Sequence, residues 1–250
     1  MSAMKAIGVV VACAALLGSV AVRAADLAVI SAGALEAGIT QLATQFERDT
    51  RHTVRVQIGN APQITARLAS GDTADVLVAP AAIVEQALKD GVAVRTTRET
   101  IGRVGVAVVV RAGAPRPDIA TVDALRTALL AAPAVIYNQG SSGTYIEQML
   151  AGLGIADRVN AKRVRVLNGE AVMERMAAAT GDEIAFLAMS DAIRAGGLQF
   201  VGPLPPALQN FTMYEAAVMS QAREPVVAAQ FVRSIAGPQA RTVWMRAGVE

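Results

Sequence analysis

Residues 137–145 read YNQGSSGTY, and this short stretch joins the parts of an α/β unit. The apolar residues 134–137 before the turn predict a buried strand. Small and polar residues then form a turn, and apolar residues at helical spacing predict a helix over residues 145–153. The order of strand, small-residue turn and helix N-terminus is the unit from which the rest of the fold can be predicted.

The same turn is a candidate anion site. The first backbone N–H groups of a helix have no partner inside the helix, and the helix dipole places about half a positive charge there. Ser141, Ser142 and Thr144 add hydroxyl donors, and Gly140 and Gly143 allow the main chain to approach a ligand. The alternative is purely structural: Ser142 or Thr144 caps the helix, and the glycines only form the turn.

Similar units run along the whole chain. The predicted strands are residues 27–30, 53–58, 75–79, 104–111, 134–137, 163–167, 183–187, 198–201 and 211–219, and the predicted helices are residues 35–49, 62–69, 81–89, 122–130, 145–153, 171–179, 225–235 and 237–244. Because strands and helices alternate, we expect an α/β fold with doubly wound parallel sheets and right-handed crossovers. Ligands bind such sheets at the carboxyl ends of the strands.

Two segments rich in glycine and proline, residues 113–118 and 202–206, interrupt this series. We therefore predict two α/β lobes, the first formed by residues 25–105 and 212–250 and the second by residues 106–211. Two strands then cross between the lobes, and a ligand cleft lies between them.

The N-terminus carries an export pattern. Lys5 precedes an unbroken apolar run over residues 6–22, and small residues surround a cleavage point after Ala24. This pattern predicts a secretory signal peptide over residues 1–24 and a periplasmic mature protein. A permanent membrane anchor is one alternative, and Cys13 suggests a second, a lipoprotein.

Charge and composition exclude several functions. A chain starting at Ala25 loses Lys5 and Arg23 from the 23 basic residues and none of the 21 acidic residues, so its formal net charge is zero. This balance, without a basic stripe, argues against a nucleic-acid partner. Cys13 is the single cysteine, so the mature chain can form no disulfide. His52 is the single histidine, which excludes a multi-histidine zinc site, and we expect a solvated turn residue there and no cofactor or metal.

Five short motifs carry a resemblance to a known family: SAGAL at 31–35, GDTADV at 71–76, GTY at 143–145, GEAV at 169–172 and SDA at 190–192. In this order they resemble the type 2 periplasmic solute-binding proteins of the molybdate-binding branch, over essentially the whole mature chain. The resemblance implies two lobes joined by two crossover strands, which close on a small anion that is then delivered to an ABC permease in the inner membrane. We expect the mature protein to be a monomer.

The paired turns and the resemblance together give the predicted ligand-binding residues. They lie at the turns after strands in both predicted lobes and number twelve: Ser31, Ala32, Gly33, Asn60, Ala61, Ser141, Ser142, Gly143, Thr144, Tyr145, Glu170 and Val172. At the position of Val172 the family uses a backbone amide.

The chain departs from the molybdate binders at three aligned positions. That family uses a serine in each of the first two turns and a tyrosine late in the second lobe, where this chain has Ala34, Ala61 and Ala188. A hydrogen bond to a charged group contributes about 1.5–3 kcal/mol, so three losses lower affinity by orders of magnitude. We expect molybdate and tungstate to bind weakly or not at all, and an anion of another shape to bind better.

A closer resemblance is to a divergent subgroup with the pattern R-x-G-A-P-x-P-D-I, here residues 111–119, and VGPLP, here residues 201–205. This subgroup includes aconitate isomerases. Moving a proton beside carboxylates requires a base and N–H or cationic donors, and Glu170 and Tyr145 are the candidates for such roles. Glu170 is alternatively a first-turn acid that the helix dipole favours. A carrier, an isomerase and a ligand-sensing partner of a membrane receptor therefore remain open.

Overall fold

The computed structural model describes residues 24–250. The N-terminal part contains β1 (Asp26–Ala32), η1 (Gly33–Leu35), α1 (Glu36–Thr50), β2 (Thr53–Gly59), α2 (Ala61–Ala69), β3 (Val76–Pro80), α3 (Ala81–Lys89) and η2 (Arg95–Thr97). The middle part contains β4 (Glu99–Arg111), α4 (Val122–Ala131), β5 (Val135–Asn138), α5 (Ser141–Gly152), α6 (Ala156–Asn160), β6 (Arg163–Val166), α7 (Gly169–Ala177), β7 (Ile184–Ala188), α8 (Met189–Ala192), β8 (Leu198–Pro203) and η3 (Pro206–Leu208). The C-terminal part contains β9 (Phe211–Val218), α9 (Pro225–Ala236), η4 (Pro238–Ala240) and α10 (Arg241–Arg246).

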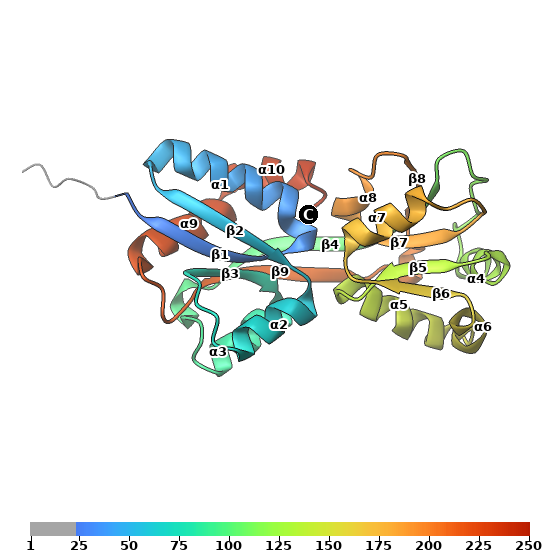
Figure 1. Cartoon of the computed structure of the whole chain (residues 1–250), viewed down its shortest axis with the longest axis horizontal. Coiled ribbons are helices and arrows are strands. Elements are labelled where there is room, and N and C mark those ends of the chain that lie inside the picture. Colours follow the sequence, from blue (N-terminus) through green and yellow to red (C-terminus); the bar gives the residue numbers. More distant parts are fainter. Residues whose placement is uncertain (1–23) are drawn as a thin grey trace, which may run out of the picture.

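Two lobes share one strand order. In the first lobe the order is β2-β1-β3, followed by the antiparallel strand β9; in the second it is β6-β5-β7, followed by the antiparallel strand β4. Strands β1, β2 and β3 run parallel, as do β5, β6 and β7. The predicted α/β fold with two doubly wound lobes is therefore confirmed (Figure 1).

Strands β4 and β9 connect the lobes (Figure 1). The first part of β4, up to Gly105, pairs with β9, whereas the part from Val106 pairs with β7 and β8. The first part of β4 thus belongs to the sheet of one lobe and its last part to the sheet of the other. The lobe limits given above, with a boundary between residues 105 and 106, stay a prediction about independent folding units.

Apolar cores explain why the sequence forms these layers. Helices cover both faces of the parallel strands, so β3 and β7 are buried at every position and consist of continuous apolar residues. One core joins β1 and β3 to α1, α3 and α9. Two further cores lie on the two faces of the second sheet, one against α4 and α5 and the other against α7.

Several elements differ from the sequence-based expectation. Helix α5 begins at Ser141, four residues before the expected start, because Gly140 serves as its N-cap and the hydroxyl-rich residues form its first turn. Strand β4 begins at Glu99 because its first residues pair with β9, which lies more than a hundred residues away in sequence. The short helices α6 and α8 were not predicted; each is five residues or fewer.

The expectation that His52 is solvated is wrong. The side chain is 7% exposed, and its Nδ1 accepts a hydrogen bond from the backbone N–H of Ala25 at 3.0 Å. Its ring stacks on Phe46 with a centroid distance of 6.1 Å. The pattern of polar neighbours could not indicate this, because β1 begins beside the turn and covers it.

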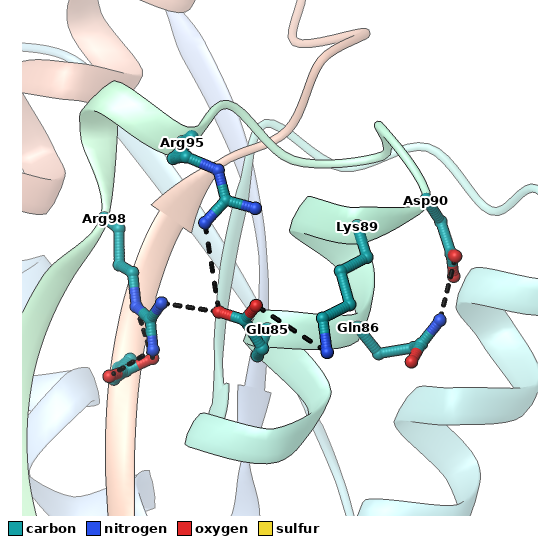
Figure 2. Close-up of polar contacts among 7 residues, drawn as sticks. Glu85, Gln86, Lys89, Asp90, Arg95 and Arg98 are labelled. Carbon is teal, nitrogen blue, oxygen red and sulfur yellow. Dashed lines mark hydrogen bonds and ion pairs between the residues drawn. The ribbon is translucent and has the colours of Figure 1, made fainter.

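Ion pairs fix β9 against α3. Arg98 makes two hydrogen bonds to Glu215, each 2.9 Å long, and a third to Glu85 at 2.6 Å. Arg95 and Lys89 approach the same Glu85 at 4.0 and 3.9 Å (Figure 2). This network holds the register of β9 at Glu215. The preceding residue, Tyr214, faces the opposite side of the sheet and lines the cavity described below.

The predicted signal peptide lies outside the described residues except for Ala24. Within residues 24–250, none of the helices combines the length and apolarity that crossing a bilayer requires.

Candidate functional site

A cavity lies between the lobes, at the carboxyl ends of their parallel strands. Its volume is about 480 Å³. It is lined from the first lobe by Ala32, Gly33, Ala34, Glu36, Ile58, Gly59, Asn60, Ala61, Gln63 and Pro80, from the second lobe by Asn138, Gly140, Ser141, Ser142, Asn168, Gly169, Glu170, Met173, Ala188, Asp191 and Arg194, and from β9 by Tyr214. These residues follow β1, β2, β3, β5, β6 and β7, so six loops of equivalent position meet at one site.

Asn60 shapes the wall of the first lobe and reaches the second. It is the N-cap of α2: its Oδ1 accepts from the N–H of Gln63 at 2.9 Å, and the Gln63 side chain accepts from the N–H of Asn60 at 2.8 Å. The Asn60 Nδ2 then donates to the backbone oxygen of Leu167 in the second lobe at 2.8 Å. Asn60 therefore both starts a helix and holds the two walls together.

In the second lobe, Asn138 orders the turn that leads into α5. This side chain is 6% exposed; its Oδ1 accepts from the N–H of Gly140 at 2.7 Å, and its Nδ2 donates to Ser142 Oγ at 3.2 Å. No side chain caps α5. The backbone N–H groups of Ser141 and Ser142, in the first turn, consequently have no partner inside the helix and are free for a ligand.

Seven of the twelve predicted residues line the cavity: Ala32, Gly33, Asn60, Ala61, Ser141, Ser142 and Glu170. Ser31 does not, because it is fully buried and its Oγ donates weakly to the Ala32 carbonyl at 3.4 Å. Val172 is fully buried in the core of the second lobe.

Three residues of the SGTY stretch also lie outside the lining. An ideal Cβ on Gly143 would overlap the backbone oxygen of Asn138, so the close contact within the loop by itself requires glycine here. Thr144 is exposed, and its Oγ1 donates to the carbonyl of Gly140 one turn earlier at 3.2 Å. Tyr145 packs against the core, and its hydroxyl donates to the Leu208 carbonyl at 2.6 Å.

The three alanines at the aligned molybdate positions, Ala34, Ala61 and Ala188, all line the cavity. Each contributes a methyl group where the resemblance implies a hydroxyl. Polar side chains reach the cavity from other positions instead.

Asp191 and Arg194 are two lining residues that sequence reasoning missed. Asp191 is 8% exposed, and its Oδ1 accepts from Nη2 of Arg194 at 3.2 Å. Burial raises the pKa of Asp191 to about 6, against the opposing effect of Arg194, and the charge of Glu36 adds to the rise. A signal was present, since Asp191 belongs to the SDA motif of the resemblance and Arg194 follows it at helical spacing.

Tyr214 on β9 is the third missed residue. It is 5% exposed, and burial together with the charge of Asp191 raises the pKa of its phenol, so it stays neutral and can donate a hydrogen bond. A tyrosine thus lines the site, although from a crossing strand rather than from the position of Ala188. The sequence predicted that Tyr214 lies in a strand, but the side of the sheet that its side chain faces depends on the pairing of β9 with β3 and β4.

The charges around the cavity are unequal. Glu36, Glu170 and Asp191 are acidic, and Arg194 is the single basic side chain among the described lining residues. Within residues 24–250, no group of three or more metal-binding side chains is close enough to hold an ion. The site therefore offers one cationic side chain, that of Arg194, together with free backbone N–H groups and three carboxylates.

These features define a two-lobe binding protein with a polar cavity between its lobes. The sequence profile described as bacterial extracellular solute-binding protein matches residues 27–250, and the chain belongs to this family.

Solved structures share the fold. The periplasmic molybdate-binding protein of Azotobacter vinelandii superposes with a TM-score of 0.74 at 22% identity, covering 90% of this chain and 98% of that one. The sulfate-binding protein of Mycobacterium tuberculosis superposes with a TM-score of 0.72 at 18% identity, covering 90% of this chain and 86% of that one. At these identities the similarity concerns the fold.

A curated relative in sequence is an aconitate isomerase of a Pseudomonas species. It is 28% identical over 219 residues, which cover 86% of this chain and 83% of the relative.

Proposed function

We propose that the mature protein captures a small organic anion bearing carboxylates in the interlobe cavity and delivers it to an ABC permease. The observation that carries the proposal is the convergence of the uncapped N-terminus of α5 and Arg194 on one cavity between two lobes. Backbone N–H groups and a guanidinium are the donors that carboxylates require. A ligand that contacts both lobes stabilises the closed arrangement by those contacts.

The cavity favours an organic acid over a tetrahedral oxyanion. Ala34, Ala61 and Ala188 supply none of the hydroxyl donors that the molybdate binders use for a tetrahedral oxyanion. A volume of about 480 Å³ lies in the range of about 300–1,000 Å³ found for pockets of organic ligands. Hydroxyl or protonated carboxyl groups on the ligand could also donate to Glu36 or Glu170.

A thermal-shift screen followed by calorimetry tests this proposal. The panel contains molybdate, tungstate, sulfate, citrate, malate and both isomers of aconitate. We expect at least one di- or tricarboxylate to raise the melting temperature and to bind in the micromolar range or tighter, while molybdate and tungstate bind weakly or not at all. Submicromolar molybdate binding would contradict the interpretation of the three alanines.

Export and partners follow from the family and from the N-terminal pattern. We infer cleavage after Ala24, a periplasmic monomer, and docking to an inner-membrane permease; the family description as extracellular supports the location. The intact mass of the exported protein checks this inference, since retained residues 1–24 or a lipid on Cys13 would contradict it.

Isomerisation of aconitate is a second candidate function. The aconitate isomerase relative favours it, as does a buried acid, Asp191, paired with a basic residue in the cavity. Steady interconversion of cis- and trans-aconitate by the purified protein would establish the enzyme. Tight binding without turnover would favour the carrier.

A further inference from the structure

Asp191 occupies a place that the surrounding chain leaves open for it. An ideal Cβ on Gly169, the first residue of α7, would overlap Asp191 Oδ2 and lie 3.0 Å from its Cγ. Gly169 is not among the glycines with positive φ, so its backbone conformation does not require glycine. The missing side chain instead makes room for the carboxylate of Asp191.

The two oxygens of this carboxylate are in different situations. Oδ1 is held by Arg194, whereas Oδ2 makes no hydrogen bond to another residue of 24–250 and is not among the fully enclosed unpaired atoms. Since Asp191 lines the cavity, Oδ2 is the oxygen available to a ligand.

Arg194 is fixed beside it and retains donors. Its Nε donates to the backbone oxygen of Ser190 at 3.0 Å and its Nη2 to Asp191. No hydrogen bond within the described chain uses Nη1, and the side chain is 39% exposed. A ligand carboxylate that pairs with Nη1 of Arg194 therefore lies near the Asp191 carboxylate.

We propose that Asp191 takes a proton from a carbon atom of a bound unsaturated tricarboxylate and returns it to another, while Arg194 holds one carboxylate of that ligand. This inference rests on the second proposed function. Asp191 Oδ2 removes a proton from the methylene carbon beside the double bond, and the electron pair of that C–H bond enters the allylic system conjugated to the carboxylates. The proton then bonds to the far carbon. One C–H bond breaks, one forms, the double bond moves by one position, and no oxidant or reductant is needed.

The other cavity acids are placed differently. Glu170 is exposed in the first turn of α7, and Glu36 is exposed at the start of α1, so water solvates both carboxylates. Asp191 is poorly solvated, which makes its carboxylate a stronger base. Tyr214 and the first-turn N–H groups of α5 can stabilise the charge that develops on the ligand.

Proton NMR in D₂O with purified protein and each isomer of aconitate tests the proposal. Wild-type protein should interconvert the isomers and incorporate deuterium at the methylene carbon. Asp191→Asn should lower both rates at least a hundredfold while aconitate still binds in calorimetry. Arg194→Gln should weaken binding about tenfold or more. Glu174→Gln, an exposed acid on α7 outside the cavity lining, is the matched control and should behave as wild type.

The possible results separate the two proposals. Turnover by Asp191→Asn at the wild-type rate overturns the role of Asp191, as does loss of turnover in Glu170→Gln alone. Wild-type protein that binds aconitate without exchange or isomerisation also overturns it and leaves the carrier intact, whereas absence of any carboxylate binding removes the underlying function. If Asp191→Asn does not fold, Gly169→Ala replaces it: the added Cβ displaces Oδ2, and undiminished turnover would then refute the proposal.

Discussion

Asn60 Nδ2 donates to the backbone oxygen of Leu167 at 2.8 Å, and this hydrogen bond joins the two lobes at the mouth of the cavity. The two residues are 107 positions apart and lie at the ends of equivalent strands, β2 and β6. The two lobes are therefore in direct contact through this bond. Any ligand that requires closure benefits from it.

The first prediction concerns this bond. Asn60→Ser keeps an oxygen that can cap α2 but is too short to reach Leu167. A net hydrogen bond of about 0.5–1.5 kcal/mol corresponds to a roughly two- to tenfold weaker ligand affinity. Calorimetry with the ligand found in the screen measures the affinity of Asn60→Ser and of wild type.

Its control is Asn60→Ala, which also removes the cap. Without ligand this variant should be about 1 kcal/mol less stable than Asn60→Ser, which keeps the cap. An unchanged affinity of Asn60→Ser would show that the contact contributes nothing to closure.

The second prediction separates Ser142 from Thr144. Ser142 lines the cavity, whereas Thr144 is exposed and bonds to Gly140. Ser142→Ala should weaken ligand binding by roughly ten- to a hundredfold if its hydroxyl contacts a charged ligand, and Thr144→Ala should leave binding unchanged. Calorimetry measures the ligand affinity of both variants, and thermal melting without ligand measures their stability. Full affinity of Ser142→Ala, with lowered apo stability, would make this turn purely structural.

The sequence predicted the fold well because the spacing of apolar residues and the residue types that form turns are local properties of the chain. The strands and helices of both lobes follow from apolar runs and small-residue turns, and the carboxyl ends of those strands do form the cavity. The site was predicted only in part because the direction of a side chain depends on distant pairing. Ser31 and Ala32 are neighbours on β1, yet one is enclosed and the other lines the cavity.

Residues missed by sequence reasoning depend on contacts between distant segments. Asp191 is buried because α8 packs beside Gly169, and Tyr214 faces the cavity because β9 pairs with β3 and β4. The SDA motif marked Asp191 itself, but no local pattern indicates that it packs beside Gly169 or that Tyr214 faces the cavity. At Gly143 the close approach that requires glycine is to the backbone of Asn138, and its role as a ligand contact stays a prediction.

The third prediction concerns His52 and the start of the mature chain. In a protein beginning at Ala25, the nitrogen that donates to His52 Nδ1 is the terminal amine. His52→Ala leaves this donor without a partner and should lower the free energy of unfolding by about 1–3 kcal/mol. His52→Asn, whose Oδ1 can accept at a similar position, should lose less. Urea denaturation of the chain starting at Ala25 compares them, and equal stability of all three would contradict an anchoring role.

The fourth prediction is the pH dependence of stability at Asp191. Burial raises its pKa in the folded state to about 6, above its ordinary value of 3.8, so the folded protein holds this proton more tightly than the unfolded chain does. Stability contributed by the protonated acid is complete below pH 4 and is lost as pH rises through about 6. Other acids titrate in the same window, so the informative quantity is the difference between Asp191→Asn and wild type.

That difference in unfolding free energy should rise in favour of Asp191→Asn between pH 4 and pH 6.5, by up to about 3 kcal/mol, and then stay level. Urea denaturation at closely spaced pH values measures it. Arg194, Glu36 and Tyr214 face the carboxylate, and of these Arg194 opposes the rise. If Arg194 outweighed burial, the folded pKa would lie below 3.8. The difference would then move in favour of wild type as pH rises, so the sign of the slope decides whether burial or the ion pair controls this residue.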